Sequence, residues 1–155
     1  MNCNHIGEYG CLLARIELIK RGIVCITMNP VFYDFDLYTN NNKRIEIKTA
    51  NLQTSKVIKR QGEYIQESWT FNLAKWSYKK KKDKPRLKRD CDYYVLVCLN
   101  LLSNAERFYV VPNAEINHNK RILTIHRNKK ELFNSKSKWV QYKNNWEQIN
   151  SPPQS

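Results

Sequence analysis

The sequence predicts one α/β domain, in which an opening helix is followed by a mixed β-sheet with smaller helices on its flanks. The chain has 155 residues, of which 41% are hydrophobic, and this suits one compact domain with a core. Helical spacing near the N-terminus, and the apolar run "DYYVLVCLNL" at residues 92–101, indicate the helix and a buried central strand. We expect the domain to span residues 1–150 and residues 151–155 to form a disordered tail.

The opening helix is predicted from "IGEYGCLLARIELIKRG" at residues 6–22. Its large apolar side chains recur at near-helical spacing, at Leu12, Leu13, Ile16 and Ile19. Gly22 follows two basic residues and is a natural stop for the helix. The next segment, "IVCITM", is typical of a short strand.

A β-hairpin is predicted next, over "FYDFDLYTNNNKRIEIKTA" at residues 32–50. Alternation along its first strand places Phe35 and Leu37 on one face and Asp34, Asp36 and Tyr38 on the other. The run "TNNNK" suits the turn, because asparagine tolerates left-handed backbone conformations.

The returning strand, "RIEIKTA", places Ile45 and Ile47 on the apolar face, and Glu46 and Lys48 on the opposite face. The hairpin therefore gathers carboxylates and a lysine on one face. Carboxylates supply the hard oxygen ligands that Mg²⁺ prefers, and a bound metal lowers the pKa of a water that can attack a phosphodiester. The alternative is a pair of charged ladder neighbours that face solvent.

The later segments predict further strands and a packed C-terminal segment. "ERFYVVP" ends a strand at Pro112, and "RILTIH" forms another short strand. "WTFNLAKW" suits a strand running into a short helix, and we expect the polar stretch "NLQTSKVIKRQGEYIQES" to be exposed. The aromatic segment "SKWVQYKNNWEQI" is expected to pack on the sheet.

The charge favours a polyanionic partner. The chain carries 27 Lys and Arg against 14 Asp and Glu, for a net charge of +13. Nucleic acid is the first candidate, because such an excess attracts it and releases its counterions. An anionic membrane is the second, although no basic helix has a strong apolar face. The alternative is that the positive charge serves only to keep the protein soluble. We see neither a membrane-spanning run nor a secretion signal, so we expect a cytoplasmic protein with no membrane partner.

Basic residues concentrate between residues 75 and 89, which carry nine Lys or Arg and one Asp. This segment is either a solvated loop or an arm that contacts phosphates, and so basic a chain favours the arm. The DNA-contacting candidates are Lys79, Lys80, Lys81, Lys82, Lys84, Arg86, Lys88 and Arg89. Trp69, Trp76 and Tyr78 flank this run, and core packing is their expected role.

The cysteines and histidines suggest no metal centre of their own. Five cysteines, with no C-x-x-C pair, are expected to be reduced thiols rather than disulfides or zinc ligands. His118, Asn119 and His126 hint at a histidine-based nuclease finger, but their spacing is poor, and we interpret them as surface residues.

The hairpin resembles the D…(D/E)-x-K motif of the PD-(D/E)XK nuclease superfamily, through Asp34 or Asp36 followed by Glu46-Ile47-Lys48. The opening helix, "KTA" after the motif lysine, the strands "DCDYYVLVCL" and "RFYVVP", and the end "YKNNWEQI" are similar to the small intron-encoded homing endonucleases of the cyanobacterial type. The resemblance covers roughly residues 6–149, and only its hairpin is specific. It implies a restriction-endonuclease-like core.

This sequence departs from the family pattern in two places. The half-motif "PD" is absent, because Pro30 precedes Asp34 by four residues. Family members often carry "YD" at this point, which matches Tyr33-Asp34. Asp36 is nearly as good a match. The helix position where such enzymes often carry a glutamate is Cys11 here. Glu8, about one turn earlier, is either a substitute metal ligand or an acid at a helix start.

The resemblance implies a Mg²⁺-dependent endonuclease of double-stranded DNA, with one or two cations held by Asp34 or Asp36 and by Glu46, and with Glu8 as a further candidate ligand. Lys48 would orient or activate the attacking water, and the products would be a 5′-phosphate and a 3′-hydroxyl. A homing endonuclease is the first interpretation, and a Holliday-junction resolvase or restriction-type nuclease is the second. A nucleic-acid-binding protein with a decayed site is a third. Cutting both strands with one site per chain predicts a homo-oligomer, either a dimer or a tetramer.

Overall fold

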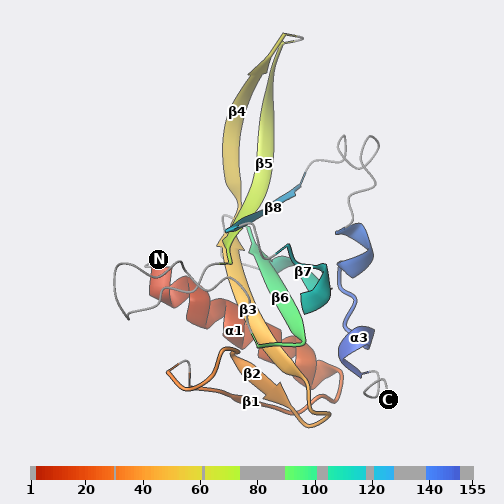
Figure 1. Ribbon diagram of the computed structural model, residues 1–155. Helices are drawn as coiled ribbons and strands as arrows, with labels where there is room; N and C mark the ends of the chain where they lie inside the picture. The colour runs from red at the N-terminus through yellow and green to blue at the C-terminus, as the bar shows by residue number, and fades with distance from the viewer. Residues whose placement is uncertain are drawn as a thin grey trace.

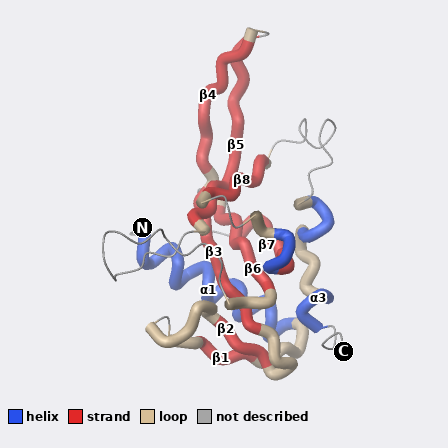
Figure 2. Tube along the Cα trace, viewed as in Figure 1, coloured by secondary structure: helices blue, strands red, loops and turns tan. Residues whose placement is uncertain are grey.

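A computed structural model describes residues 3–29, 31–60, 62–73, 90–100, 105–117, 121–127 and 139–150 of the chain. Its main sheet has five strands in the order β1-β2-β3-β6-β7 (Figures 1 and 2). These strands are β1 (Cys25–Thr27), β2 (Leu37–Thr39), β3 (Arg44–Asn51), β6 (Tyr93–Leu99) and β7 (Ala105–Pro112). β3 and β6 run parallel and the other neighbours are antiparallel, so the predicted α/β fold with a mixed sheet is confirmed.

β3 and β6 form the centre of this sheet. Their register pairs Glu46 with Tyr94 and Lys48 with Leu96. The predicted central strand is confirmed, because every residue of β6 after Tyr93 is buried. The predicted strand ending at Pro112 is β7, which covers the other edge of β6.

Helix α1 (Cys3–Lys20) packs across one face of the sheet, behind β3 and β6 in the view of Figure 1. The predicted helix is confirmed and turns at Gly22, whose φ is +74°. Three of the four apolar side chains that predict the helix do not lie on its buried face, because Leu12, Ile16 and Ile19 are 52%, 40% and 62% exposed. The buried side instead carries residues at i, i+4 and i+8, namely Gly10, Ala14 and Leu18.

A close approach between α1 and β3 explains why small residues occupy this side. A Cβ built on Gly10 would lie 1.8 Å from Thr49 Oγ1, so only glycine fits here without movement. Tight interior packing leaves little room for such movement, and steric exclusion rather than the apolar period therefore fixes the rotation of the helix.

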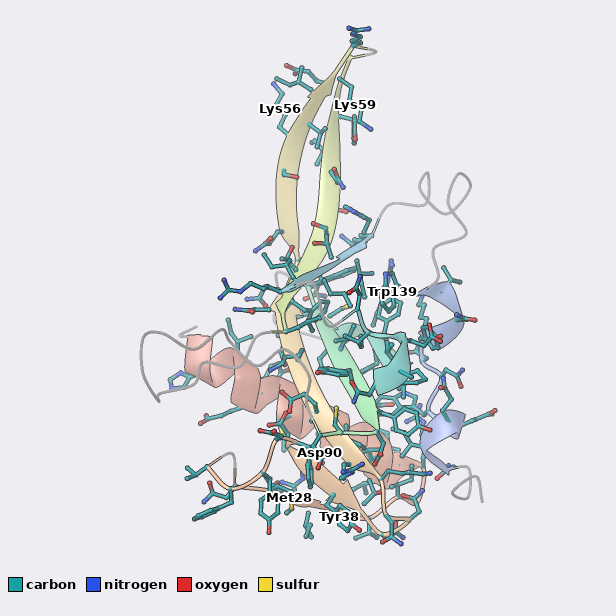
Figure 3. All side chains as sticks on the ribbon, viewed as in Figure 1. Met28, Tyr38, Lys56, Lys59, Asp90 and Trp139 are labelled. Carbon is teal, nitrogen blue, oxygen red and sulfur yellow. The ribbon has the colours of Figure 1, made fainter. Side chains whose placement is uncertain are left out.

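A second sheet of three strands, in the order β4-β5-β8, was not predicted. It comprises β4 (Gln53–Lys59), β5 (Gly62–Asn72) and β8 (Ile122–His126). The polar stretch expected to be merely exposed is the β4–β5 hairpin, which projects well beyond the other helices and strands (Figures 1 and 3). The predicted strand over "RILTIH" is β8, and it pairs with β5 rather than with a nearby partner in sequence.

Only the base of the projecting hairpin joins the core. Trp69, Phe71, Leu123 and Ile125 are all buried in the cluster that also contains Tyr94. Core packing of Trp69 is therefore confirmed, and its Nε1 donates a 2.7 Å hydrogen bond to the Leu99 carbonyl.

The C-terminal segment packs on the sheet as predicted. It contains two short helices, η2 (Val140–Tyr142) and α3 (Glu147–Asn150), while η1 (Asn113–Glu115) follows β7. Tyr142, Trp146 and Ile149 are buried. The Tyr93 hydroxyl donates a 3.0 Å hydrogen bond to the Gln148 carbonyl, which ties α3 to the start of β6.

Several predictions fall on residues outside the described ranges. The basic run with its flanking Trp76 and Tyr78, the C-terminal tail, and two members of the histidine pattern, His118 and Asn119, are among them. Within the described ranges, no helix is long and apolar enough to cross a membrane. There, Cys11, Cys25, Cys91 and Cys98 are thiols, of which Cys91 and Cys98 are buried and Cys11 and Cys25 are half-buried.

Candidate active site

Glu46 and Lys48 form an ion pair on the central strand β3. The Lys48 Nζ lies 2.8 Å from Glu46 Oε1, and the two side chains are 20% and 3% exposed. Both are on the sheet face of Tyr94 and Leu96, opposite to α1, because their neighbours Ile45 and Ile47 pack with the helix. An ionised carboxylate buried to this degree requires a cation beside it, and Lys48 supplies that cation.

Asp36 is tied to the same strand through its backbone. β2 ends its pairing at Leu37, opposite Ile45, so Ile47 has no strand partner on that side. The Ile47 N–H donates a 2.7 Å hydrogen bond to Asp36 Oδ2. The Asp36 N–H in turn donates a 2.9 Å hydrogen bond to the Ile45 carbonyl. The carboxylate thereby takes the place of a ladder partner at the residue between Glu46 and Lys48, leaving its other oxygen for a further contact.

The prediction that two aspartates, one glutamate and one lysine share one face of the hairpin is wrong, because the aspartates are not part of a strand. Residues 34–36 form a bend before β2, not part of a strand. Phe35 consequently packs in the cluster of Tyr94, whereas Leu37 packs in the cluster of α1, so these two residues do not share a face. Asp36 reaches β3 from its edge, and only Glu46 and Lys48 point to a common face of the strand.

Helix α1 brings a thiol to Asp36. Burial raises the pKa of Cys11 to about 11, and the negative charge of Asp36 adds to the rise. Arg15 lies one turn further along the helix, and its positive charge acts in the opposite direction on the pKa of Cys11. Cys11 is therefore a neutral thiol that lies close enough to Asp36 to be affected by its charge.

The structure argues against one of the two roles predicted for Glu8, that of an acid at the start of the helix. The helix begins at Cys3, and its first turn contains no acidic residue, so Glu8 is not an acid at a helix start. Its side chain is exposed. Within the described ranges, no group of three or more His, Cys, Asp or Glu residues is close enough to hold a metal ion.

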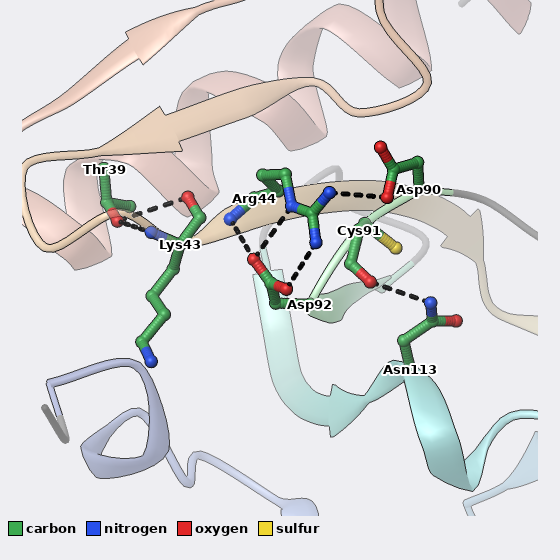
Figure 4. A network of polar contacts seen from close by, with 7 residues as sticks. All are labelled: Thr39, Lys43, Arg44, Asp90, Cys91, Asp92 and Asn113. Carbon is green, nitrogen blue, oxygen red and sulfur yellow. Dashed lines mark hydrogen bonds and ion pairs between the residues drawn. The ribbon is translucent and has the colours of Figure 1, made fainter. Parts of the chain in front are cut away.

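A polar network next to the site fixes the ends of the two central strands (Figure 4). Arg44, at the start of β3, binds Asp92 with its Nε and Nη2 at 3.2 and 2.9 Å, and its backbone N–H donates to the same carboxylate at 2.8 Å. Burial tends to raise the pKa of Asp92, but the hydrogen bonds from Arg44 outweigh this and lower it. This bidentate clamp sets the register that pairs Glu46 with Tyr94.

Arg15 and the projecting hairpin were missed at the level of sequence. Arg15 is four residues after Cys11 and seven after Glu8, so helical spacing alone places a cation on the side of α1 near Asp36. The hairpin had a weaker signal, since "KRQG" lies between two runs that contain β-branched and aromatic residues.

Comparison with solved structures identifies a similar fold. A bacterial homing endonuclease, I-Ssp6803I, superposes with a TM-score of 0.66 over 96% of this chain and 93% of that chain, at 16% sequence identity. No protein family matches the sequence, and no curated protein matches it. The chain therefore shares the fold of this homing endonuclease.

Proposed function

We propose that this protein is a Mg²⁺-dependent DNA endonuclease of the PD-(D/E)XK type, acting as a homing endonuclease. The observation that carries the proposal is the Glu46–Lys48 ion pair on the central strand, with Asp36 bound to the residue between them. The proposal is further supported by a fold shared with a bacterial homing endonuclease and by the net charge of +13. Asp34 stays an alternative to Asp36, and the Ile47 contact favours Asp36.

Asp36 and Glu46 are the residues that would hold Mg²⁺. Both side chains are carboxylates, which are suitable ligands for Mg²⁺. This ion is often bound through only one or two carboxylates together with substrate phosphates. When bound, Mg²⁺ supplies a more acidic water and a positive charge at the phosphate. A group of three protein ligands is therefore not required, and Glu8 and Asp34 are further proposed ligands.

Lys48 would release Glu46 to the metal and turn to the reacting groups. Its side chain is 20% exposed, so it can reach solvent, where a substrate phosphate and the attacking water would lie. There it would orient the water and balance the negative charge that develops on the phosphate. Arg15, whose charge acts on Cys11 as that of Asp36 does but in the opposite direction, adds a second positive charge on α1.

Double-stranded DNA is the proposed substrate, and a homo-oligomer is the proposed assembly. The basic run, including Lys79–Lys82, would contact phosphates and so supply affinity without sequence preference. A dimer or tetramer would present two sites to opposed strands. Light scattering of the protein bound to DNA tests this, since a monomer that cuts both strands at once contradicts it.

A second candidate is a DNA-binding protein whose catalytic site has decayed. The observation that favours it is Cys11, whose pKa of about 11 keeps a neutral thiol beside Asp36 where the family often has a carboxylate. Such a protein would bind duplex DNA with the same salt dependence but would not cut it.

Lys48→Ala tests the proposed function. We expect it to lower Mg²⁺-dependent nicking of plasmid DNA by about 10²–10⁴-fold, the usual contribution of a positioned catalytic group, while DNA binding is largely retained. The matched control is Lys56→Ala, which removes the lysine of an exposed ion pair on β4 and should leave nicking within a fewfold of wild type. Full activity of Lys48→Ala would overturn the assignment.

The substrate geometry separates the remaining nuclease alternatives. Wild-type protein should cut linear duplex DNA in preference to a four-way junction. The opposite preference identifies a resolvase. Binding without any cleavage, in Mg²⁺ or Mn²⁺, identifies the decayed site.

A further inference from the structure

The β4–β5 hairpin has two chemically different faces. Residues that pair across the two strands share a face, and the faces alternate along each strand. One face, here called the polar face, consists of Gln53, Ser55, Val57, Lys59, Tyr64, Gln66 and Ser68. The other, here called the mixed face, consists of Thr54, Lys56, Ile58, Glu63, Ile65 and Glu67.

The mixed face is continuous with the core of the protein and carries ion pairs within the chain. At the base of the hairpin it continues into the buried Trp69 and Phe71. Further out it carries two isoleucines, Ile58 and Ile65, which are 73% and 64% exposed. Its carboxylates are paired within the protein, because Glu63 binds Lys56 and Glu67 binds Arg127 of the segment after β8.

The polar face offers hydrogen-bonding groups and no carboxylate among its described residues. Ser55 and Gln66 lie opposite each other, and Ser55 Oγ donates to the main-chain carbonyl of Gln66 at 3.4 Å. The Gln66 amide also contacts the His126 ring on β8, and this contact restrains the amide in place. Lys59 lies over the Tyr64 ring, 5.2 Å from its centroid, at the outer end of the same face.

These features match what the major groove of B-DNA presents. The groove admits a two-stranded β-ribbon, and glutamine can bind both hydrogen-bonding groups of adenine, serine can bind either base edge, and an apolar side chain can contact the thymine methyl. Val57 supplies such an apolar group next to Tyr64. A face without carboxylates avoids repulsion from phosphates, whereas the mixed face would bring Glu63 and Glu67 against them.

The chain path sets where the hairpin would lie relative to the cleavage site. β3 leads into β4 with only Leu52 between them, and the two strands run in line in Figure 1. Ser55 is seven residues after Lys48, and a strand rises about 3.3 Å per residue. The span is therefore at most about 23 Å, which corresponds to about seven base pairs at 3.4 Å each.

We propose that the β4–β5 hairpin enters the major groove of duplex DNA with its polar face, and that Ser55 and Gln66 determine sequence specificity there. This inference rests on the proposed DNA substrate, and it assigns the recognition to a site separate from the cleavage residues. The basic run supplies affinity without sequence preference, whereas the hairpin supplies sequence discrimination.

The experiment compares two double variants of the full chain that leave its charge unchanged. Ser55→Ala with Gln66→Ala removes hydrogen-bonding groups from the polar face. Thr54→Ala with Ile65→Ala changes the same two strands on the mixed face and is the matched control. Circular dichroism and thermal unfolding establish that both variants fold. The probe is a pool of linear duplexes with a randomised central segment, from which bound DNA is selected and sequenced for each protein.

The polar-face variant should lose about tenfold or more of its base discrimination over a few adjacent positions, within about seven base pairs of the cut. The mixed-face variant should keep the wild-type preferences. Unchanged preferences in the polar-face variant overturn the inference, and so does a loss confined to the mixed-face variant. Preference for A-form RNA duplexes, whose major groove is too narrow for a ribbon, also overturns it.

These outcomes are independent of cleavage. A wild-type protein that selects a sequence through the polar face and never cuts it supports the inference and contradicts the proposed nuclease. A wild-type protein that cuts DNA, with preferences unaltered by the polar-face changes, supports the nuclease and contradicts the inference.

Discussion

The β2–β3 and β4–β5 hairpins are neighbours in sequence and nearly opposite in environment. β3 is covered on one side by α1 and on the other by the core cluster around Tyr94, so Ile45 is 0% exposed. In the β4–β5 hairpin, Ile58 is 73% exposed and its cross-strand neighbour is Glu63. Both contain β-branched residues alternating with charged ones, and each has a Lys–Glu ion pair. The difference teaches that alternation defines two faces, whereas the elements packed on those faces decide whether a charge is buried or solvated.

The largest expected effect is a loss of cleavage activity on substitution of Asp36, compared with Asp34 in the same bend before β2. Asp36→Asn should reduce cleavage by about two to four orders of magnitude, because it removes a charge at a site where charge stabilisation dominates the rate. Asp34→Asn, in the same bend, should cost far less. Nicking rates of both variants under saturating Mg²⁺ decide the order. The match to "YD" makes the contrary prediction, so a larger loss for Asp34→Asn would move the ligand to Asp34.

A second prediction compares isoleucines in the two hairpins. Ile45→Ala should lower the free energy of unfolding by about 2–5 kcal/mol, because it leaves a cavity in the core. Ile58→Ala, at an exposed position, should change it by about 0.5 kcal/mol or less. Urea unfolding followed by tryptophan fluorescence measures both. Similar losses at the two positions would mean that the outer part of the hairpin is covered in solution.

The ion pairs give a third comparison. A double-mutant cycle on Lys56 and Glu63, whose side chains are 64% and 53% exposed, should give a coupling free energy of about 0–1 kcal/mol that vanishes in high salt. The cycle on Lys48 and Glu46 should give a larger coupling that salt hardly changes, because the pair is screened from solvent. Equal salt dependence in the two cycles would contradict the buried environment of Glu46.

The smallest effect is the reactivity of Cys11 next to the site. Burial and then the charge of Asp36 raise the pKa of its thiol to about 11. At pH 9 the folded protein should therefore be alkylated at Cys11 more slowly by iodoacetamide than the urea-unfolded chain is, as mass spectrometry can measure.

The raised pKa of Cys11 also makes the stability of the folded protein depend on pH. The unfolded thiol ionises near pH 9 while the folded thiol stays protonated until about pH 11, so the contribution of Cys11 to stability is present below pH 9 and is lost as the pH rises. Asp36→Asn should speed the alkylation of folded protein by removing a charge that raises the pKa. No change on that substitution would mean that Asp36 does not lie beside the thiol.

The sequence by itself determined the local elements around the site. Helical spacing and Gly22 give α1, the Asn-rich turn with Asn42 at a φ of 61° joins β2 to β3, and the apolar run gives β6. Each is a property of a few consecutive residues, namely a period, a turn conformation or a continuous apolar stretch, and so needs no knowledge of distant partners. The pairing of Glu46 and Lys48 on one face of a strand follows in the same way from their spacing of two.

Only the tertiary structure decided what those elements face. The rotation of α1 depends on the contact of Gly10 with Thr49, and the position of Asp36 depends on the pairing of β2 with β3 stopping at Leu37, the residue after it; neither is a local property. The pairing of β5 with β8 joins residues 50 to 58 positions apart, and nothing in either segment indicates the other as its partner. Such strands are stabilised by main-chain hydrogen bonds and by a buried base at Trp69, so their existence depends on contacts that no short stretch of sequence contains.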